Sequence, residues 1–223
     1  MCLALGFAQL GRWQLSREDS KREQLAAAES ALAGPARGLA AGLLASSTGI
    51  TRVEGRARFT ATPRLWLDNQ RRDQQVGMRL YCAAMPVDGG TPLLVDLGWL
   101  PVAPDRRLPA VDCPGGEHQV SGLLVPPPAV GLRLGPGLVE HDGAWLATRL
   151  DPSEVSLAWS SAPAFADRVL RLDPATPLGH DRDLALLSNT LPPEKHRGYA
   201  VQWFGLAVAT LVILIVLNLR RRP

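Results

Sequence analysis

The stretch YAVQWFGLAVATLVILIVLNL, residues Tyr199 to Leu219, decides the architecture of this 223-residue chain because it carries no formally charged side chain. At about 1.5 Å of rise per residue, a helix over this stretch is about 31 Å long, which matches the hydrocarbon thickness of a bilayer. Trp203 lies near one end, where aromatic rings favour the headgroup level, and Arg220 to Arg222 follow the other end. We therefore expect a transmembrane helix here, with His196 on its aqueous side.

The chain also begins with an apolar run, but this run is short. Only the residues from Met1 to Gly11 precede Arg12, and they span about 16 Å as a helix, half of what a bilayer needs. A signal peptide is disfavoured because no basic segment precedes the run and no small-residue cleavage site follows it. We interpret residues 1–13 as a first transmembrane helix whose opening turns are missing because the chain begins at an internal Met. The alternative is a short interfacial or buried helix.

Composition and charge exclude several classes of protein. Hydrophobic residues make up 46% of the chain and charged residues 20%, which is too polar for a multi-span transporter but suits a soluble domain beside an anchor. The formal net charge of +3 equals the charge of Arg220 to Arg222 alone, so no nucleic-acid-binding surface is indicated. Hydrolase elbows, phosphate-binding loops and zinc-protease pairs are absent from the sequence, so we do not expect an enzyme.

The cysteines do not indicate a metal site. Cys2, Cys82 and Cys113 are widely spaced, without a CxxC pair or the Cys/His spacing of a zinc site. A copper chaperone would need clustered thiolates or a Met-rich tract, and the chain has only 3 Met. A Cys82–Cys113 disulfide is the alternative to free thiols.

The hydrophobic pattern changes twice between the apolar ends. Strong helix formers run from Gln14 to Ala33, and Gly34-Pro35 stops them, which predicts a helix that leaves the membrane. The rest of residues 14–49 is small and weakly patterned, as in a linker with at most a short helix. From residue 50 onward apolar residues alternate with polar ones, the pattern of a half-buried strand.

Strand signals then recur along the chain, and a Gly-bearing turn over residues 87–91 joins two of them as a hairpin. The candidate strands are 50–59, 64–68, 76–86, 92–100, 117–125, 144–148 and 165–172. Asp151 followed by Pro152 predicts the start of a helix. Consecutive short strands with few helices indicate an α+β membrane protein, in which an antiparallel β-rich domain, barrel- or sandwich-like, lies between two transmembrane helices. We assign residues 50–195 to this domain, 196–219 to the second span and 220–223 to a basic tail. The expected core aromatics of the domain are Trp66, Trp99, Trp145 and Trp159.

Three motifs, in this order and spacing, resemble the Surfeit locus protein 1 family of cytochrome c oxidase assembly factors. They are LGRWQLSR at residues 10–17, LVDLGWLP at 94–101 and KHRGYAVQWF at 195–204. Residues 106–109 and Trp145 fit the same resemblance, which covers nearly the whole chain. Two positions depart from the family pattern, since Leu97 replaces an Arg and Lys195 stands where an Asn often precedes the His.

The resemblance implies a chaperone of the respiratory chain in the bacterial inner membrane, with a periplasmic main domain and a cytoplasmic C-terminus. Bacterial members are described as binding haem a and helping to deliver it to subunit I of the terminal oxidase, with the His of the last motif implicated. By that correspondence His196 is the candidate iron ligand. The implied partners are subunit I or its assembly intermediates, membrane lipid and haem a synthase.

Helical spacing suggests how a haem could be held. On the second span one stripe is formed by His196, Tyr199, Ala200, Trp203 and Ala207. On the first helix a matching stripe is formed by Gly6, Gln9, Trp13 and Arg17. We hypothesise that these stripes oppose each other, with Arg12 or Arg17 available to the haem propionates. The candidate cofactor-binding residues are therefore His196, Tyr199, Trp203, Trp13, Arg12 and Arg17.

Two alternatives remain open at this point. Trp and Tyr at a membrane boundary are commonly interfacial anchors, and a His beside a span is commonly solvated. The chain could then be a scaffold that holds an oxidase subunit or an assembly intermediate without binding haem. The remaining histidines, His118, His141 and His180, are expected to be ordinary surface side chains.

Overall fold

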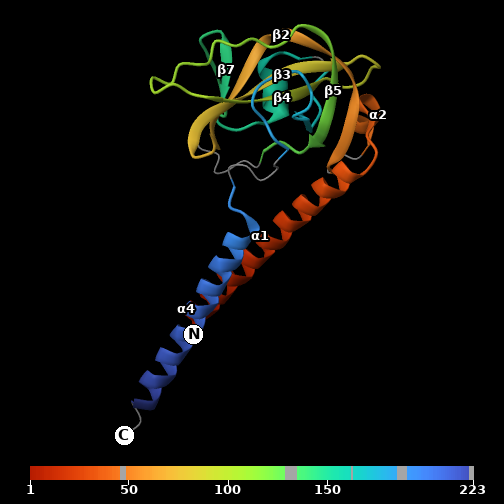
Figure 1. Ribbon diagram of the computed structural model, residues 1–223. Helices are drawn as coiled ribbons and strands as arrows, with labels where there is room; N and C mark the ends of the chain where they lie inside the picture. Colours follow the sequence, from red (N-terminus) through yellow and green to blue (C-terminus); the bar gives the residue numbers. More distant parts are fainter. Residues whose placement is uncertain (46–48, 129–134, 162, 185–189, 221–223) are drawn as a thin grey trace. The chain divides into compact units, whose positions relative to one another are not determined.

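The computed structural model describes residues 1–45, 49–128, 135–161, 163–184 and 190–220. The chain divides into two compact units, one made of Met1–Ala26 with Asn189–Pro223 and the other of Ala27–Ser188. The first unit is a pair of helices and the second contains the β-sheet (Figure 1). Residues 221–223 of the predicted basic tail lie outside the described residues.

The helix pair is antiparallel. Helix α1 (Cys2–Ala33) runs along α4 (Pro193–Arg220) in Figure 1. Phe7 contacts Trp203 near one end of the pair, and Lys21 bonds to Thr190 near the other. Among the helices that the structure describes, α4 alone is long and apolar enough to cross a membrane. Helix α4 is therefore compatible with a membrane anchor, whereas the predicted first span in α1 stays a prediction.

Inward positions of both helices alternate between spacings of three and four residues, the pattern of a coiled-coil seam. In α1 the buried or half-buried seam residues are Ala4, Phe7, Gly11, Gln14, Glu18 and Lys21. In α4 they are Pro193, His196, Ala200, Trp203 and Ala207. Small seam residues allow the backbones to approach closely. A Cβ atom on Gly11 would lie 2.8 Å from the Phe204 ring.

The β domain contains a closed, barrel-like sheet. Its strands are β2 (Thr51–Arg72), β3 (Gln75–Pro86), β4 (Leu93–Pro101), β5 (Gly116–Val125) and β8 (Val169–Leu172). They pair in the order β3-β4-β8-β5-β2, and β2 pairs again with β3 to close the ring. The barrel alternative of the predicted fold is thus confirmed. The pairing of β4 with β8 is parallel, so the barrel is not wholly antiparallel as predicted.

Shorter elements complete this unit. They are β1 (Arg37–Gly38), α2 (Leu39–Leu44), β6 (Leu138–His141), β7 (Ala144–Ala147) and α3 (Pro152–Ala158). The β6–β7 hairpin extends the sheet because β7 pairs in parallel with β2. The side chain of Asp151 accepts a hydrogen bond from the Ser153 backbone N–H at 3.1 Å, which confirms the predicted start of α3.

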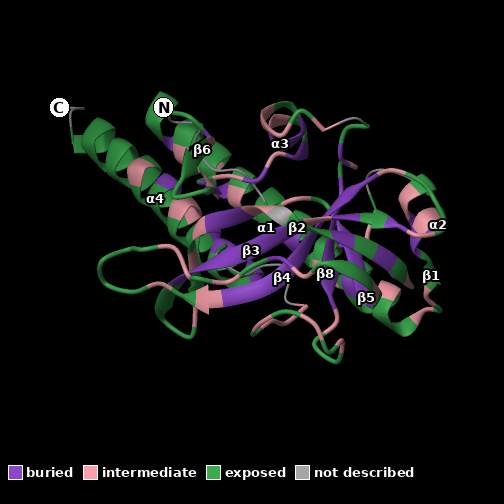
Figure 2. Ribbon diagram, turned by 90° about the horizontal axis from the view of Figure 1, so that it is seen from above, coloured by how far each residue is buried: buried purple, intermediate pink, exposed green. Residues whose placement is uncertain are grey.

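Two buried clusters lie on opposite faces of the curved sheet, because neighbouring strand residues point to opposite sides. Trp66 and Leu80 belong to one cluster, and Leu65 and Tyr81 belong to the other. Figure 2 shows that most of strands β3 and β4 is buried as a result. Of the predicted core tryptophans, Trp66 and Trp99 are buried, whereas Trp145 and Trp159 are half-buried.

Two strands differ from the sequence prediction, and one open alternative is decided. Strand β2 is continuous where two strands were expected, and β6 was not predicted. Cys82 and Cys113 form a disulfide, which decides the alternative that the sequence left open. Both cysteines are buried, whereas the free thiol of Cys2 is exposed.

Candidate functional site

His196 occupies the first turns of α4, just before the uncharged stretch. Pro193 is the first residue of the helix, where its missing N–H costs nothing and its φ angle suits the helical turn. From there the helical repeat turns His196 into the seam, where its side chain is only 7% exposed. A histidine so buried is not the solvated interface residue of the alternative interpretation.

The two ring nitrogens of His196 have different surroundings. Nδ1 lies 2.7 Å from Oε1 of Gln14 in α1, a hydrogen-bond distance. Nε2 is buried and has no hydrogen-bond partner among the described residues. A buried polar atom without a partner costs about 1–3 kcal/mol, so each instance in a native structure calls for an explanation. A role in binding a ligand is one such explanation.

Charged side chains of α1 surround this imidazole. Arg17, Glu18 and Lys21 all act on it electrostatically. Lys21 is buried and donates from Nζ to the hydroxyl of Thr190 at 2.8 Å. Burial, and then the neighbouring Arg17, lower the pKa of the Lys21 ammonium. Glu18 pairs with Arg22 at 2.7 Å, so this carboxylate already has a cationic partner.

The other predicted site residues are only partly brought together. Trp203 is half-buried in the seam, and its ring stacks on Phe7 with 5.7 Å between the ring centroids. Tyr199 is 41% exposed and Trp13 is 54% exposed. Arg12 and Arg17 are exposed as well. The structure therefore places His196 and Trp203 within the seam and the remaining residues on the outer surface of the helix pair.

The predicted face of α1 is wrong. The stripe of Gly6, Gln9, Trp13 and Arg17 was expected to face α4, yet all four residues are exposed. The α1 residues that contact α4 lie on the neighbouring face and include Phe7, Gly11 and Gln14. Lys21, on the same face, bonds to Thr190 just before α4. The expectation selected aromatic and arginine residues, whereas close helix packing selects small ones. The seven-residue spacing of Ala4 and Gly11, matched by Ala200 and Ala207, is the signal that could have identified this face and, with it, Gln14.

A family model described as the SURF1 family matches residues 1–208. The chain belongs to the SURF1 family. The match spans α1, the whole β domain and the first half of α4, and so includes all three motifs. The SURF1 family is associated with membranes and with cytochrome oxidase assembly, and its members are assembly factors rather than known enzymes. A search of curated proteins found no match to this chain.

The second motif of this SURF1 chain, LVDLGWLP, has a structural role. Gly98 has a φ of +111°, and a Cβ atom there would lie 2.8 Å from the carbonyl oxygen of His180. The Trp99 N–H donates to the carbonyl of Asp181 at 2.7 Å. The motif therefore docks the segment around residue 180 onto β4. Leu97, at the departure from the family pattern, is buried in the core and brings no charge there.

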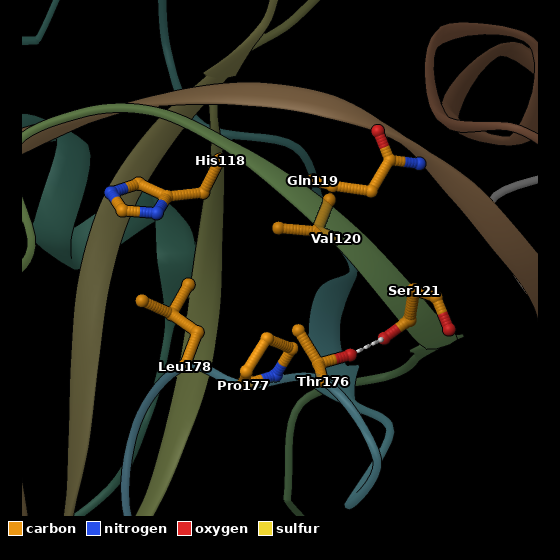
Figure 3. Close-up of a pocket in the computed structure, with 7 residues that line it drawn as sticks. All are labelled: His118, Gln119, Val120, Ser121, Thr176, Pro177 and Leu178. Carbon is orange, nitrogen blue, oxygen red and sulfur yellow. Dashed lines mark hydrogen bonds between the residues drawn. The ribbon is translucent and has the colours of Figure 1, made fainter.

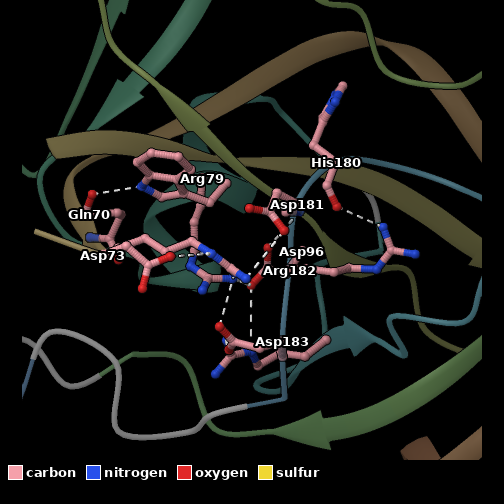
Figure 4. A network of polar contacts seen from close by, with 12 residues as sticks. Gln70, Asp73, Arg79, Asp96, His180, Asp181, Arg182 and Asp183 are labelled. Atoms are coloured by element: carbon pink, nitrogen blue, oxygen red, sulfur yellow. Dashed lines mark hydrogen bonds and ion pairs between the residues drawn. The ribbon is translucent and has the colours of Figure 1, made fainter. Parts of the chain in front are cut away.

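Asp96 of the same motif lies within a buried polar network (Figure 4). Its carboxylate accepts from Arg79 Nη1 at 2.9 Å and from the Gly98 N–H at 3.0 Å, and it lies 3.6 Å from Arg171 Nε. Burial, and then Asp96, raise the pKa of the neighbouring Tyr81 phenol. Because its charged groups pair with one another, we interpret this network as a structural cluster that connects β3, β4 and β8.

The remaining histidines offer no second site. Within the parts of the chain that the structure describes, no three His, Cys, Asp or Glu side chains are grouped to hold a metal. His118 borders an open cavity of about 200 Å³ beside β5 (Figure 3), but its Nε2 already lies 3.0 Å from the carbonyl of Gly115. His141 is exposed, and His180 is half-buried.

Proposed function

We propose that this SURF1 chain assists assembly of a haem-copper oxidase by binding haem a through His196 and presenting it to subunit I. The observation that carries the proposal is the buried Nε2 atom without a hydrogen-bond partner. A neutral imidazole nitrogen is a normal ligand of haem iron. A bound haem would supply the iron, and Nε2 of His196 would be its protein ligand. The association of the family with oxidase assembly supports the same role.

The neighbours of His196 suit the rest of a haem a molecule. Lys21 and Arg17 place positive charge beside the imidazole, where carboxylate propionates would gain charge-assisted hydrogen bonds. Arg12 is a further cation on the same helix. Trp203, Tyr199 and Trp13 offer aromatic surface near the membrane boundary for the ring and its apolar tail. His196 is the proposed metal ligand, and the other residues are proposed to hold the macrocycle.

We further propose that both helices cross the bacterial inner membrane. The support comes from packing, since the apolar start of α1 lies along the uncharged part of α4 through Phe7 with Trp203 and Gly11 with Phe204. Side chains of α4 beyond Thr210 are exposed and almost entirely apolar, as expected of a surface that faces lipid. His196 would then lie at the membrane surface, where haem a also partitions.

The disulfide supports a periplasmic β domain. Disulfides persist in oxidising compartments such as the periplasm and are rare in the cytosol, and the Cys82–Cys113 bond lies inside this domain. Arg220 at the far end of α4 would then lie on the cytoplasmic side. The positive-inside rule does not decide the orientation, because Arg12, Arg17, Lys21 and Arg22 place basic residues on the opposite side.

Haem binding by His196 can be tested directly. The full chain and its His196→Ala variant are purified in detergent from cells that make haem a, and the haem content and absorption spectrum are compared. We expect the variant to lose the haem spectrum or to bind at least about 10-fold more weakly. His141→Ala is the matched control, because this histidine is 53% exposed and is the last residue of β6. Equal spectra and affinities for His196→Ala and wild type would exclude ligation.

The second candidate function is a scaffold for an apo-subunit of the oxidase. The exposure of Trp13 and Tyr199 favours it, because exposed aromatic residues commonly anchor protein interfaces. The same purification distinguishes the two functions. Stoichiometric haem supports a haem carrier, whereas copurified subunit I without haem supports the scaffold.

A further inference from the structure

We propose that Gln14 is a positioning residue, whose amide oxygen holds the His196 proton on Nδ1 and thereby leaves the Nε2 lone pair free for iron. The consequence for iron binding rests on the proposed haem function. The assignment of the proton itself does not, because it can be measured without haem.

The geometry places the amide oxygen of Gln14 against Nδ1 of His196. The Gln14 Oε1 atom lies 2.7 Å from Nδ1 of His196, although the two residues are 182 positions apart in the sequence. Packing on both sides of the pair sets this distance, through Gly11 against Phe204 and through Lys21 with Thr190. Gln14 is half-buried and His196 is buried, so water competes poorly for the bond.

A hydrogen-bond acceptor beside Nδ1 decides which nitrogen of the imidazole carries the proton. A neutral imidazole has one N–H donor and one lone pair, and the partner of one nitrogen decides which atom carries the proton. A free histidine in water prefers the proton on Nε2, which would block the nitrogen proposed for iron. An acceptor on Nδ1 reverses that preference and also fixes the orientation of the ring, as outer partners of metal-binding histidines do. Glu18 is the nearby carboxylate, but it pairs with Arg22, which leaves the role to Gln14.

Nitrogen NMR tests the proton assignment in the haem-free full chain. The protein is labelled with ¹⁵N-histidine in detergent, about two pH units above the ordinary histidine pKa, and the His196 signals are identified by their loss in His196→Ala. We expect wild type to show a protonated Nδ1 and an unprotonated Nε2. Gln14→Leu should move the proton to Nε2, and Gln14→Glu, which keeps an acceptor oxygen, should retain it on Nδ1.

Three outcomes overturn the proposal. The first is a wild-type His196 with its proton on Nε2, which would mean that the Gln14 amide nitrogen donates to Nδ1. The second is a Gln14→Leu spectrum identical to wild type. The third is a proton that moves equally in Gln14→Leu and Gln14→Glu. Circular dichroism of both variants shows whether the helices still form, and the wild-type proton position still decides the assignment if Gln14→Leu does not fold.

Haem binding supplies a separate arm of the experiment. If His196 binds haem a, Gln14→Leu should weaken haem affinity by about 10–100-fold and Gln14→Glu by much less. A proton that moves as expected in a chain that never binds haem would overturn the proposed function but keep the role of Gln14. Haem bound equally by wild type and Gln14→Leu would keep the function and overturn the positioning role.

Discussion

Asp96 and His196 are both buried polar residues, but they differ in how completely the fold satisfies them. The Asp96 carboxylate accepts from Arg79 and from the Gly98 N–H, whereas Nε2 of His196 has no partner among the described residues. Native interiors pair nearly all of their buried polar groups. The satisfied charge of Asp96 therefore fits a structural role, whereas Nε2 of His196 keeps an unused hydrogen-bonding position, on which the proposed haem ligation rests.

Removing the Asp96 carboxylate should be costly. Asp96→Ala leaves Arg79, which is 5% exposed, without its closest carboxylate. Breaking a buried pair in this way typically costs about 3–5 kcal/mol, because one charge stays buried. Urea unfolding of the full chain in detergent, followed by near-UV circular dichroism, measures the loss. The control is Asp112→Ala, since this aspartate pairs with Arg64 but is 80% exposed, and it should cost less than about 1 kcal/mol. Equal losses in the two variants would contradict the structural role of Asp96.

His180 should make stability depend on pH. Burial, and then the nearby Arg182, lower the pKa of its imidazole from the usual value of 6.5. Near that pH the unfolded chain binds more protons than the folded chain, so stability rises with pH through this window. The contribution is fully present above the unfolded pKa and is lost as the pH falls through the lower, folded pKa. His180→Gln should therefore flatten the stability profile between about pH 5 and pH 7.5. Thermal unfolding at several pH values measures the slope, and parallel profiles for variant and wild type would refute this role.

The strands and helices that were predictable from sequence are those whose apolar residues recur with a clear period. Strands β3, β4 and β5 follow alternating or buried apolar runs, and the Asp151 cap marks α3. The continuity of β2 was missed because Pro63 interrupts the pattern, where the strand in fact shifts its register between Phe59 and Arg64. β6 was missed because it has only four residues, most of them exposed.

The part of the candidate site on α4 could be predicted, because it lies in a sequence motif and on a regular helical stripe. His196 lies in a motif that sequence comparison identifies. Of the predicted α4 stripe, Ala200, Trp203 and Ala207 lie in the seam as expected, whereas Tyr199 is exposed. Gln14 also lies in a motif, LGRWQLSR, but the motif alone does not show that its side chain meets His196. Its bond to His196 depends on which faces of two distant helices meet, and small and polar seam residues give α1 no apolar stripe to reveal its inward face.

The close docking at β4 predicts that Gly98 is intolerant of a side chain. Gly98→Ala combines a positive φ with a Cβ atom 2.8 Å from the His180 carbonyl oxygen. Gly89 has a φ of +87° but nothing within 4 Å of its Cβ position, so Gly89→Ala isolates the cost of the backbone conformation. We expect Gly89→Ala to lose about 1 kcal/mol, and Gly98→Ala to lose clearly more. Urea unfolding compares the stability of the two variants. Similar losses of stability would show that the segment around residue 180 moves to accommodate the added Cβ atom at little cost in free energy.

The disulfide should stabilise the β domain substantially. It links β3 to the loop before β5 across a sequence separation of 31 residues, which the chain-entropy relation converts to about 3–4 kcal/mol. The double variant Cys82→Ala/Cys113→Ala should lose about this much in chemical unfolding under non-reducing conditions. Cys2→Ser, which removes an exposed free thiol, is the control and should leave stability unchanged. A double variant as stable as wild type would show that packing alone holds the loop.

The division of the chain into two units separates the proposed chemistry from the β domain. Gln14, Lys21, His196 and Trp203 all belong to the unit formed by Met1–Ala26 and Asn189–Pro223. The disulfide and the Asp96 network belong to the other unit. Substitutions in the barrel should thus mainly lower the stability of the β domain, whereas substitutions in the helix pair should mainly weaken the proposed haem binding.

The proposed orientation predicts opposite accessibility for the β domain and for the C-terminal end of α4. In a Cys2→Ser background the only remaining cysteines form the buried disulfide, so a single introduced thiol reports its own compartment. Asp142→Cys, in the exposed β6–β7 turn, should react with a membrane-impermeant maleimide in intact spheroplasts. Arg220→Cys, at the end of α4, should react only after the membrane is permeabilised, and Arg221 and Arg222 keep the basic end of the chain. The reverse pattern would place the β domain in the cytosol, where a persistent disulfide is rare. It would also put the candidate haem site on the side of the membrane opposite to the one proposed.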